Sequence, residues 1–496
     1  MTASFPLTVL GILACLAVLA PRAWPQDKLV LGAAPPAVGQ PFPLSMEQAI
    51  DIGLRNNVSL LNAQARRALE TFDLRLAERR FIPVFSLDSD VSTTRNTSGG
   101  TTSELSAASL GPRVTALLPT GASVSATIGG QLRDGTSVTG ARQWSARVDV
   151  DQPLLRGGGI RFNKLPVAIA RKQDEAARQV LRSVYNQLAV SIAQAYYDAI
   201  LAERQVAIAS SAYDSAIRLV ENNEALIRSG RLARSELEQA KADVAVQNRA
   251  LLDAQRQHDD RLRALLLLLN LPPESQARLT TGLMAPDYVI PDVQETIAVT
   301  RASNPDLIIA RLDMDIARHT LALAEDVARP DLSLFGSYSF NGISGFNDLP
   351  AEFFPQQSQS DWRVGLRLSV PLNDLNRKRE RLSARTNESI ARNELNFLEE
   401  LTRSEVQRVI ANLRSLQYQL EISRRGVAFS ERAIAAEIEK FQAGRSSNFQ
   451  VLLLENSLNA ARQNEVRDVV EFLKAVVQIE LLKGTILDGW GIEFHG

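Results

Sequence analysis

The chain has 496 residues, a length that would suit about two to four compact domains. Its formal net charge at pH 7 is -1, so it lacks the basic excess of a nucleic-acid-binding protein, and no DNA or RNA partner is expected. Only 6% of the residues are aromatic, and Ala, Leu, Arg, Glu and Gln crowd the helical stretches, as in extended coiled coils.

The N-terminus predicts a secretory signal peptide over residues 1–24. An apolar run too short to span a bilayer comfortably ends at Ala20 and is followed by Pro21. The single cysteine, Cys15, lies in a stretch that resembles a lipoprotein-processing site, so lipidation stays open. Without lipidation it leaves with the peptide, and the mature chain has no disulfides. Residues 25–44 are rich in Pro, Gly and Ala and predict a flexible N-terminal lead.

After this lead the chain shows one pattern twice. Each half has alternating strands between two prolines, then a very long helix, a Gly-Arg turn and a shorter helix, which indicates a duplicated supersecondary unit. The predicted organisation is repeat 1 over residues 45–270 with strands at 84–152, a linker over 271–292, repeat 2 over 293–484 with strands at 331–370, and a C-terminal tail over 485–496.

Prolines mark both ends of each strand region, because proline ends a strand ladder and can begin a helix. The Gly-Arg turns, at Gly230 and Gly444, lie where a helix needs a left-handed C-terminal cap. Ser235 and Ser447 follow these turns with capping-box patterns, so both turns predict tight reversals between helices. The expected strand–helix junctions are at Pro83, Pro153, Pro330 and Pro371.

Apolar residues at helical spacing predict the long helices, the first of them capped by Ser45. The third and fourth helices together match the second in length, and the sixth and first together match the fifth. Short helices stacked end to end are therefore expected beside each long helix, in a rod of about 100 Å. In chain order the helices cover residues 45–81, 160–228, 237–270, 293–328 with an interruption at Pro305, 376–442 and 449–483.

The strand regions alternate apolar and polar residues over runs of about ten residues, the length of a tilted transmembrane strand. For example, Leu332 and Leu334 flank Ser333, and Val148 and Val150 flank an aspartate. A half-buried sheet in a soluble protein gives the same alternation. The signal peptide, the Trp and Tyr residues near strand ends and the confinement of charges to one face favour a membrane barrel.

Short motifs at residues 328–334, 369–372 and 152–155, together with the two Gly-Arg turns, occur in a duplicated order. In this order the chain resembles the outer-membrane efflux protein family, the TolC-like channels of Gram-negative bacteria. The resemblance covers nearly all of the mature chain. It implies a membrane α+β fold, in which a trimeric β-barrel is continued by a long periplasmic α-helical barrel.

The resemblance also implies a homotrimer in the lipid of the outer membrane, with a large periplasmic portion. Substrates would pass from an inner-membrane pump through a periplasmic adaptor into this channel, in efflux or in type I secretion. Neither the substrate nor the pump is indicated by the sequence. The family's helical tips contact the adaptor, and the docking residues so implied are Ser229, Gly230, Arg231, Leu232, Ala443, Gly444, Arg445 and Ser446.

Some family members constrict the periplasmic entrance with an aromatic–arginine latch or with acidic rings. The corresponding stretch of this chain offers Phe441, Arg445, Gln450 and Leu453, with Glu455 as the nearest acid, and apolar constriction by Phe441 or Leu453 is the hypothesis. The candidates for a periplasmic constriction are Phe441, Gln450, Leu453 and Glu455.

The first strand region exceeds the second by roughly 29 residues, about two strands and a turn. The surplus holds two alternating stretches, 105–118 and 122–132, joined by a short turn at Pro119, Thr120 and Gly121. We therefore expect six strands per protomer, where the family has four, and a trimer would close eighteen strands and not twelve. The alternative is a hairpin that lies outside the barrel wall.

Enzymatic activity is not expected, and neither is a cofactor or a metal site. The histidines are His258, His319 and His495, and none has a second ligand at metal-binding spacing. The glycine run 157–159 lacks the lysine of a phosphate-binding loop and indicates a strand-to-helix connection. The alternative function is a periplasmic coiled-coil scaffold or adaptor protein without a pore, which would leave the alternating strands unexplained.

Overall fold

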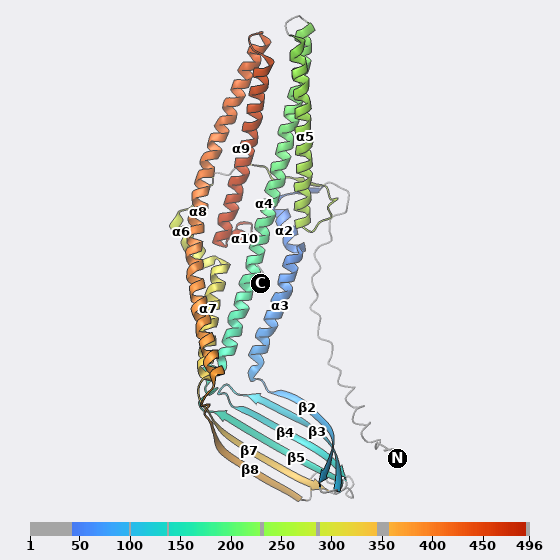
Figure 1. Ribbon diagram of the computed structural model, residues 1–496, viewed down its shortest axis with the longest axis vertical. Coiled ribbons are helices and arrows are strands. Elements are labelled where there is room, and N and C mark those ends of the chain that lie inside the picture. The colour runs from blue at the N-terminus through green and yellow to red at the C-terminus, as the bar shows by residue number, and fades with distance from the viewer. Residues whose placement is uncertain are drawn as a thin grey trace, which may run out of the picture. The chain divides into compact units, whose positions relative to one another are not determined.

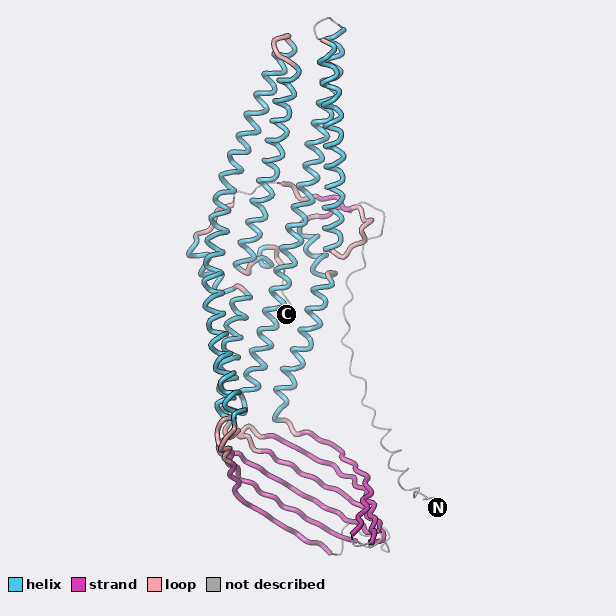
Figure 2. Tube along the Cα trace, in the orientation of Figure 1, coloured by secondary structure: helices cyan, strands magenta, loops and turns pink. Residues whose placement is uncertain are grey.

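The computed structural model describes residues 42–98, 101–135, 138–228, 233–283, 288–344 and 357–492. The predicted signal peptide, the first Gly-Arg turn and His495 lie outside these residues. The long strands lie in a separate region from the helices, whereas two strands of three residues lie beside the helices (Figure 2). Among the residues described, no helix is both long enough and apolar enough to cross a lipid bilayer.

The elements follow the duplicated order that the sequence predicts (Figure 1). Those of the first half are β1 (Phe42–Leu44), α2 (Met46–Asn56), α3 (Val58–Glu78), η2 (Arg79–Phe81), β2 (Val84–Ser98), β3 (Thr101–Leu117), β4 (Ser123–Gly135), β5 (Val138–Pro153), α4 (Ile160–Arg228), α5 (Arg234–Leu268) and β6 (Ala277–Leu279). Those of the second half are α6 (Val293–Ser303), α7 (Pro305–Val327), β7 (Asp331–Ser344), β8 (Gln357–Ser369), α8 (Leu375–Gln442), α9 (Asn448–Lys483) and α10 (Ile486–Gly489).

The long helices match their predicted bounds closely. Helix α4 has 69 residues and contains Pro166, and α8 has 68 residues, so each is about 100 Å long. The predicted interruption at Pro305 is confirmed, because the helix pauses at Asn304 and resumes as α7. Helical periodicity therefore located these elements to within a residue or two at most ends.

The prediction of one helix over residues 45–81 is wrong. The helix breaks at Asn57, whose backbone is extended at φ -68° and ψ 126°, and continues as α3 and the 3-10 turn η2. Asn57 caps α3, since its side chain accepts a hydrogen bond from the backbone N–H of Ser59 at 2.9 Å. No proline or glycine marks the break, so the apolar periodicity runs straight through it.

The predicted N-terminal caps of three helices have different outcomes. Ser45 caps α2 in a full capping box, and Ser447 caps α9 by accepting a hydrogen bond from the Gln450 N–H at 3.4 Å. The prediction for Ser235 is wrong, because the N-cap of α5 is Ala233, which makes no side-chain cap bond. Ser235 instead lies in the first turn of that helix.

Two asparagines join helices end to end. Asn57 donates from its side-chain amide to the carbonyl of Leu268, the last residue of α5, at 3.0 Å. Asn304 caps α7 and donates in the same way to the carbonyl of Leu482, near the end of α9, at 3.0 Å. Helix α5 is therefore stacked on α3, and α9 is stacked on α7.

This stacking corrects the pairs expected from length alone, which were α5 with the helix of residues 293–328 and α9 with the helix of residues 45–81. In the structure each stacked pair belongs to one repeat. Both pairs contact α4, and α8 contacts α7 and α9. Helix lengths fit both arrangements equally well, whereas the asparagine bonds identify the arrangement that the structure has.

Residues 42–44, predicted as the end of a flexible lead, form strand β1. This strand pairs in parallel with β6, which lies in the predicted linker. Tyr196 of α4 is fully buried, and its hydroxyl donates a hydrogen bond to the Leu44 carbonyl at 2.7 Å. Leu44 and Tyr196 belong to a core cluster that also contains Ile192 and Leu269. The short sheet therefore covers the core where α2, α4 and α5 meet.

Six strands form one antiparallel sheet in the order β2-β3-β4-β5-β7-β8, so the expectation of six strands is confirmed. The strands of the two repeats join because β5 pairs with β7, with Val148 opposite Tyr338. The surplus hairpin, β3–β4, lies inside the sheet between β2 and β5. Strands β2 and β8 form the two edges of this sheet within the described chain.

Over most of its length one face of the sheet is apolar and the opposite face carries charges, because side chains alternate along each strand and the strands pair in register. The ion pair of Arg95 and Glu104, at the end of β2 and β3 away from the helices, lies on the apolar face. Many of the apolar side chains are exposed in the single chain, such as Phe85 at 77% and Leu366 at 66%. The apolar face includes Phe85, Leu87, Leu110, Ile128, Val148, Tyr338, Val364 and Leu366, and the charged face includes Asp88, Arg113, Arg147, Asp149, Arg363 and Arg367.

Candidate functional site

The turn between α8 and α9, here called the second tip (residues 443–446), is a Schellman motif. The N–H of Arg445 donates to the Lys440 carbonyl at 2.8 Å, and the N–H of Gly444 donates to the Phe441 carbonyl at 3.0 Å. Gly444 has φ +72°, and a Cβ built on it would have no heavy atom within 4 Å. The backbone conformation, and not a lack of space, therefore explains the glycine.

The second tip presents most of its predicted docking residues to solvent. Ala443, Gly444 and Arg445 are exposed, and Ser446 is half-buried. The docking residues predicted at the first tip, Ser229, Gly230, Arg231 and Leu232, lie outside the described residues.

Glu437, one turn before the end of α8, stabilises the second tip. The residue is only 8% exposed, and its carboxylate accepts hydrogen bonds from the Ser446 hydroxyl and from the Lys440 ammonium, the latter at 2.9 Å. These bonds hold the pKa of the Glu437 carboxyl below its ordinary value, and the bond from Ser446 contributes most. Sequence alone does not reveal this role, because Glu437 and Lys440 also fit an exposed pair on a helix surface.

A buried asparagine pair joins the two helical hairpins near the tips. Asn223 of α4 donates to the side-chain oxygen of Asn448 at 3.3 Å, and Asn448 donates to the Glu236 carbonyl of α5 at 3.3 Å. Both asparagine side chains are completely buried. Because a buried amide that loses its partner costs free energy, this pair specifies how α9 lies against α4 and α5.

A groove of about 340 Å³ between α4 and the α8–α9 hairpin receives two of the predicted constriction residues. Phe441 is only 6% exposed and packs with Leu219 and Val451, so its ring belongs to the core of the single chain. Glu455 is half-buried in the same groove. Burial and the nearby Asp243 raise the pKa of Glu455, while Arg218 opposes this shift.

The other two predicted constriction residues lie on α9. Leu453 is 48% exposed and Gln450 is half-buried. Phe449 lies four residues before Leu453, so the two share one helix face, and it is 60% exposed. Phe449 is not among the predicted constriction residues, although its helical spacing from Leu453 is a signal in the sequence. Phe449 and Leu453 therefore form an exposed apolar pair on α9.

The four junction prolines lie at strand ends. Pro83 and Pro330 stand directly before β2 and β7, Pro153 is the last residue of β5, and Pro371 follows β8 by two residues. The missing N–H of each proline thus falls where the strand ladder stops.

Hydrogen bonds close the junction between β5 and α4. The Gly157 N–H donates to the Asp326 carboxylate of α7 at 2.7 Å, and Asn163 in the first turn of α4 donates to the Gly157 carbonyl at 2.8 Å. Arg156 pairs with Asp331 at 2.6 Å. The glycine run 157–159 is therefore a strand-to-helix connection that also holds the α7–β7 junction of the other repeat.

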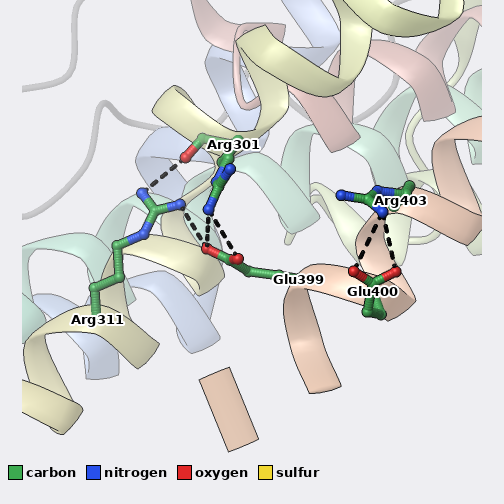
Figure 3. Close-up of polar contacts among 5 residues, drawn as sticks. All are labelled: Arg301, Arg311, Glu399, Glu400 and Arg403. Carbon is green, nitrogen blue, oxygen red and sulfur yellow. Dashed lines mark hydrogen bonds and ion pairs between the residues drawn. The ribbon is translucent and has the colours of Figure 1, made fainter. Parts of the chain in front are cut away.

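An ion-pair cluster binds the joint at Asn304, where α6 and α7 meet, to α8 (Figure 3). Glu399 of α8 accepts hydrogen bonds from Arg301 of α6 at 3.0 Å and from Arg311 of α7 at 3.3 Å. Arg311 also donates to the Arg301 carbonyl at 2.8 Å. Nearby, Glu400 and Arg403 pair within α8 at 3.3 Å. Glu399 therefore links both helices that meet at Asn304 to the continuous helix beside them.

His258 lies in α5 with its Nδ1 atom 3.2 Å from the neighbouring Asp259, and His319 lies in α7, in the helices that the sequence predicts. Over the described ranges, no group of three or more His, Cys, Asp and Glu side chains is arranged to hold a metal ion.

A sheet with one apolar and one charged face, joined to very long paired helices in two repeats, is the fold of the outer-membrane efflux channels. The chain belongs to the outer membrane efflux protein family, whose model matches residues 49–271 and 296–485. The family model thus matches both repeats.

Individual relatives are distant. The outer membrane protein TolC of Vibrio cholerae serotype O1 is 23% identical over 230 residues, 46% of this chain and 50% of that protein, so the chain spans about half the length of this curated relative. The CmeC outer membrane channel of Campylobacter jejuni has a TM-score of 0.68 at 14% identity, covering 89% of this chain and 86% of that one. VceC of Vibrio cholerae has a TM-score of 0.65 at 17% identity, covering 91% and 97%. At these identities the solved structures establish the fold.

Proposed function

We propose that this protein is the outer-membrane channel of a tripartite efflux or type I secretion system in a Gram-negative bacterium. Three copies pool their sheets into one barrel in the outer membrane, and their helices form a periplasmic tube. Substrates move passively through this channel from a periplasmic adaptor and an inner-membrane pump to the exterior. The protein itself catalyses no reaction.

The observation that carries the proposal is the two-faced sheet. Its exposed apolar face suits lipid tails, and its opposite face, with Asp88, Arg147 and Arg367, suits a water-filled lumen. In lipid an unpaired backbone polar group costs several kcal/mol, so the edges β2 and β8 require partners. A second copy of the same chain supplies the opposite edge.

Exposed apolar side chains on two outer helices support the association of copies. Leu69 and Leu76 of α3 are 61% and 62% exposed, and Phe397 and Leu401 of α8 are 69% and 51% exposed. Large apolar side chains at such positions are typical of surfaces that other chains cover. Contact between α3 of one copy and α8 of the next would bury both groups.

The test of the proposal is to isolate the full chain from outer membranes and measure its mass and conductance. We expect a trimer by native mass spectrometry in detergent and ion-conducting channels in planar bilayers. A freely soluble monomer that never fractionates with the outer membrane would contradict the proposal and favour the periplasmic scaffold.

The second tip is the proposed docking site for the adaptor. Arg445 is exposed and takes part in the Schellman motif only through its backbone N–H, so Arg445→Ala removes a charge and leaves the turn's backbone bonds in place. We expect adaptor co-purification to fall by roughly tenfold, as for an interface residue worth about 1.4 kcal/mol. Arg424→Ala, at an exposed position on α8 away from the second tip, is the matched control. Equal co-purification of the two variants would exclude Arg445 from the interface.

Constriction of the periplasmic entrance is proposed for the exposed pair Phe449 and Leu453. Leu453→Ala and Phe449→Ala should each raise the single-channel conductance, because each shortens an apolar side chain at the second tip. Leu252→Ala, at a 59% exposed position in the middle of α5, is the control and should leave the conductance unchanged. Unchanged conductance in both α9 variants would remove this pair from the constriction.

A further inference from the structure

We infer that all six strands of each copy, the β3–β4 hairpin included, form the barrel wall, so that three copies close a pore of eighteen strands. The inference rests on the proposed trimeric channel and adds the width of its outer-membrane pore. If the β3–β4 hairpin lay outside the wall, three copies would contribute only twelve strands. The two outcomes differ in what can pass the outer membrane.

The position of the hairpin in the sheet is the first argument. Strand β2 pairs with β3 along its whole length, from Val84 opposite Thr115 to Ser98 opposite Thr101. Strand β4 pairs with β5 from Ser123 opposite Asp151 onward. Within the described chain β2 reaches the other strands only through β3 and β4, so a wall without the hairpin would first have to break both ladders.

Both faces of the sheet continue across the hairpin. On the apolar face, Leu110 of β3 and Ile128 of β4 stand between β2 and β5 and are 41% and 57% exposed. On the charged face, Arg113 of β3 bonds Asp88 of β2 at 2.8 Å. Thr127 of β4 stands opposite Arg147 of β5 on that same face. The hairpin therefore has the alternation that a wall strand needs on both of its sides.

The turn of the hairpin is bound to the strand–helix junction. The Thr120 carbonyl accepts hydrogen bonds from the Gly159 N–H at 2.9 Å and from the Gln152 side chain at 3.2 Å. Gly121 has φ +93°, and a Cβ on it would lie 2.2 Å from the Gly157 carbonyl oxygen. The turn thus packs directly against the start of α4, which fixes the hairpin at the periplasmic rim of the sheet.

The directions of the edge strands allow closure. Strand β2 leaves the helices and β8 returns to them, so β8 of one copy beside β2 of the next is antiparallel, like the neighbouring pairs inside the sheet. With six strands per copy the total is even for any number of copies. Antiparallel closure with an even strand number is the rule for bacterial outer-membrane barrels.

The physical consequence is a wide pore. Barrel diameter grows roughly in proportion to strand number, so eighteen strands give a pore about one and a half times as wide as twelve. Barrels of about this strand number leave an open aqueous channel. The barrel would then pass polar solutes of larger cross-section than a twelve-stranded wall, and the narrowest level of the channel would lie in its helical part.

The direct test is cryo-electron microscopy of the full chain in lipid nanodiscs. We expect three copies and eighteen wall strands, with β3 and β4 of each copy in the wall. A trimer with twelve wall strands would overturn the inference and leave the proposed channel intact. A ring of two copies would also overturn it, because the wall would then have twelve strands.

Cysteine labelling tests the hairpin without any deletion. Thr127→Cys on the charged face and Ile128→Cys on the apolar face form one pair, and Ser145→Cys and Val148→Cys on β5 form the reference pair. Cys15, the only natural cysteine, is expected to leave with the signal peptide or to carry lipid, so labelling reports the introduced thiol. With a charged, membrane-impermeant thiol reagent, we expect Thr127→Cys and Ser145→Cys to react and the other two to be protected. Equal labelling at 127 and 128 would contradict a wall position.

A deletion variant measures the width. Removing residues 101–135 joins β2 to β5 by a short loop and leaves four strands per copy. Polyethylene glycols of graded size are added on the barrel side of planar bilayers. The pore of the deletion variant should exclude polymers that still enter the pore of the full chain. The expected ratio of the limiting radii is about 1.5. Equal limits in a folded, conducting deletion variant would overturn the inference, whereas a full chain that neither trimerises nor conducts would overturn the proposed function itself.

Discussion

In repeat 1 the strands lead into α4, and in repeat 2 they lead into α8, and these two helices have 69 and 68 residues. The strand regions before them differ far more, with β2, β3, β4 and β5 in one repeat and only β7 and β8 in the other. The helical halves have kept the same length, while the strand halves have not. Helix length and strand number are therefore set independently in this fold.

The reason lies in how each part is joined. Both repeats stack a short helix on another through an asparagine, Asn57 or Asn304, which fixes the length of each stack. A strand region has one requirement, that the chain leave the helices and come back to them. A whole hairpin satisfies it, so strands can be added in pairs and the junctions at Pro83 and Pro153 keep their roles.

The largest expected effect is a loss of stability at the joint of repeat 1, beside Asn57. At the joint of repeat 1, fully buried Tyr196 bonds the β1 backbone. Tyr196→Ala should lower the free energy of unfolding by roughly 3–5 kcal/mol, because it leaves a large cavity. Tyr196→Phe, which removes only the hydroxyl, should cost about 1 kcal/mol. Urea titration followed by circular dichroism at 222 nm measures both. An equal loss in the two variants would assign the effect to the hydrogen bond and not to packing.

The next effect should be the same in both repeats. Asn57→Ala and Asn304→Ala each remove a helix cap and an interhelical hydrogen bond, so each should destabilise the protein by about 1–2 kcal/mol. Thermal unfolding of the two variants and of the double variant is the measurement. Asn→Asp at either position keeps the acceptor that caps the helix and removes the donor to the other helix, so it separates the two contributions. Clearly unequal losses would show that the joints are not equivalent.

A smaller effect should appear only in repeat 2. Glu399→Gln weakens the pairs with Arg301 and Arg311, and we expect a loss of about 1 kcal/mol that shrinks at high salt. Glu400→Gln, in the exposed pair with Arg403, is the control and should cost a few tenths of a kcal/mol at most. Unfolding midpoints at low and high ionic strength test both. Equal effects of the two substitutions would mean that Glu399 does not hold the joint.

The smallest effect concerns acid at the second tip. Because the pKa of Glu437 is lowered in the folded chain, its stabilisation is complete above the ordinary value of 4.5 and is lost as the pH falls through the lowered pKa. Amide exchange at residues 443–446, compared with a short unfolded peptide at each pH, should therefore accelerate in strong acid. Glu437→Gln should lack this pH dependence. A wild-type tip whose protection does not change on acidification would contradict the assignment.

Much of the fold follows from local patterns in the sequence. Helix α4, the interruption at Pro305 and the six strands are all read from periodicity and from prolines, which act on the few residues around them. The break at Asn57 escapes such reading, because asparagine is tolerated inside helices and because the Asn57 side-chain amide bonds the Leu268 carbonyl, which is far along the chain. Strand β1 escapes for the same reason, since its partner β6 is also distant.

The candidate site was predicted in outline only. The turn at Gly444 follows from a glycine after a long helix, a local signal. The burial of Phe441 against α4 and the pairing of Asn223 with Asn448 depend on how separate helices cross, and a single helix pattern does not contain that information. The burial of Glu437 is a further case, because its partner Ser446 lies beyond the reversal of the chain.

The joints at Asn57 and Asn304 also bear on stiffness. Both lie beside the middle of α4, where Gly53 would place a Cβ 2.3 Å from Ile192 and where Arg182 donates to the Gly484 carbonyl at 3.1 Å. Each of the two stacked helix pairs, α3 with α5 and α7 with α9, is interrupted at its joint, and the unbroken helix α4 runs past both joints. A bending force at either joint is thus carried by α4, so the stacked pairs resist bending although each is made of two helices.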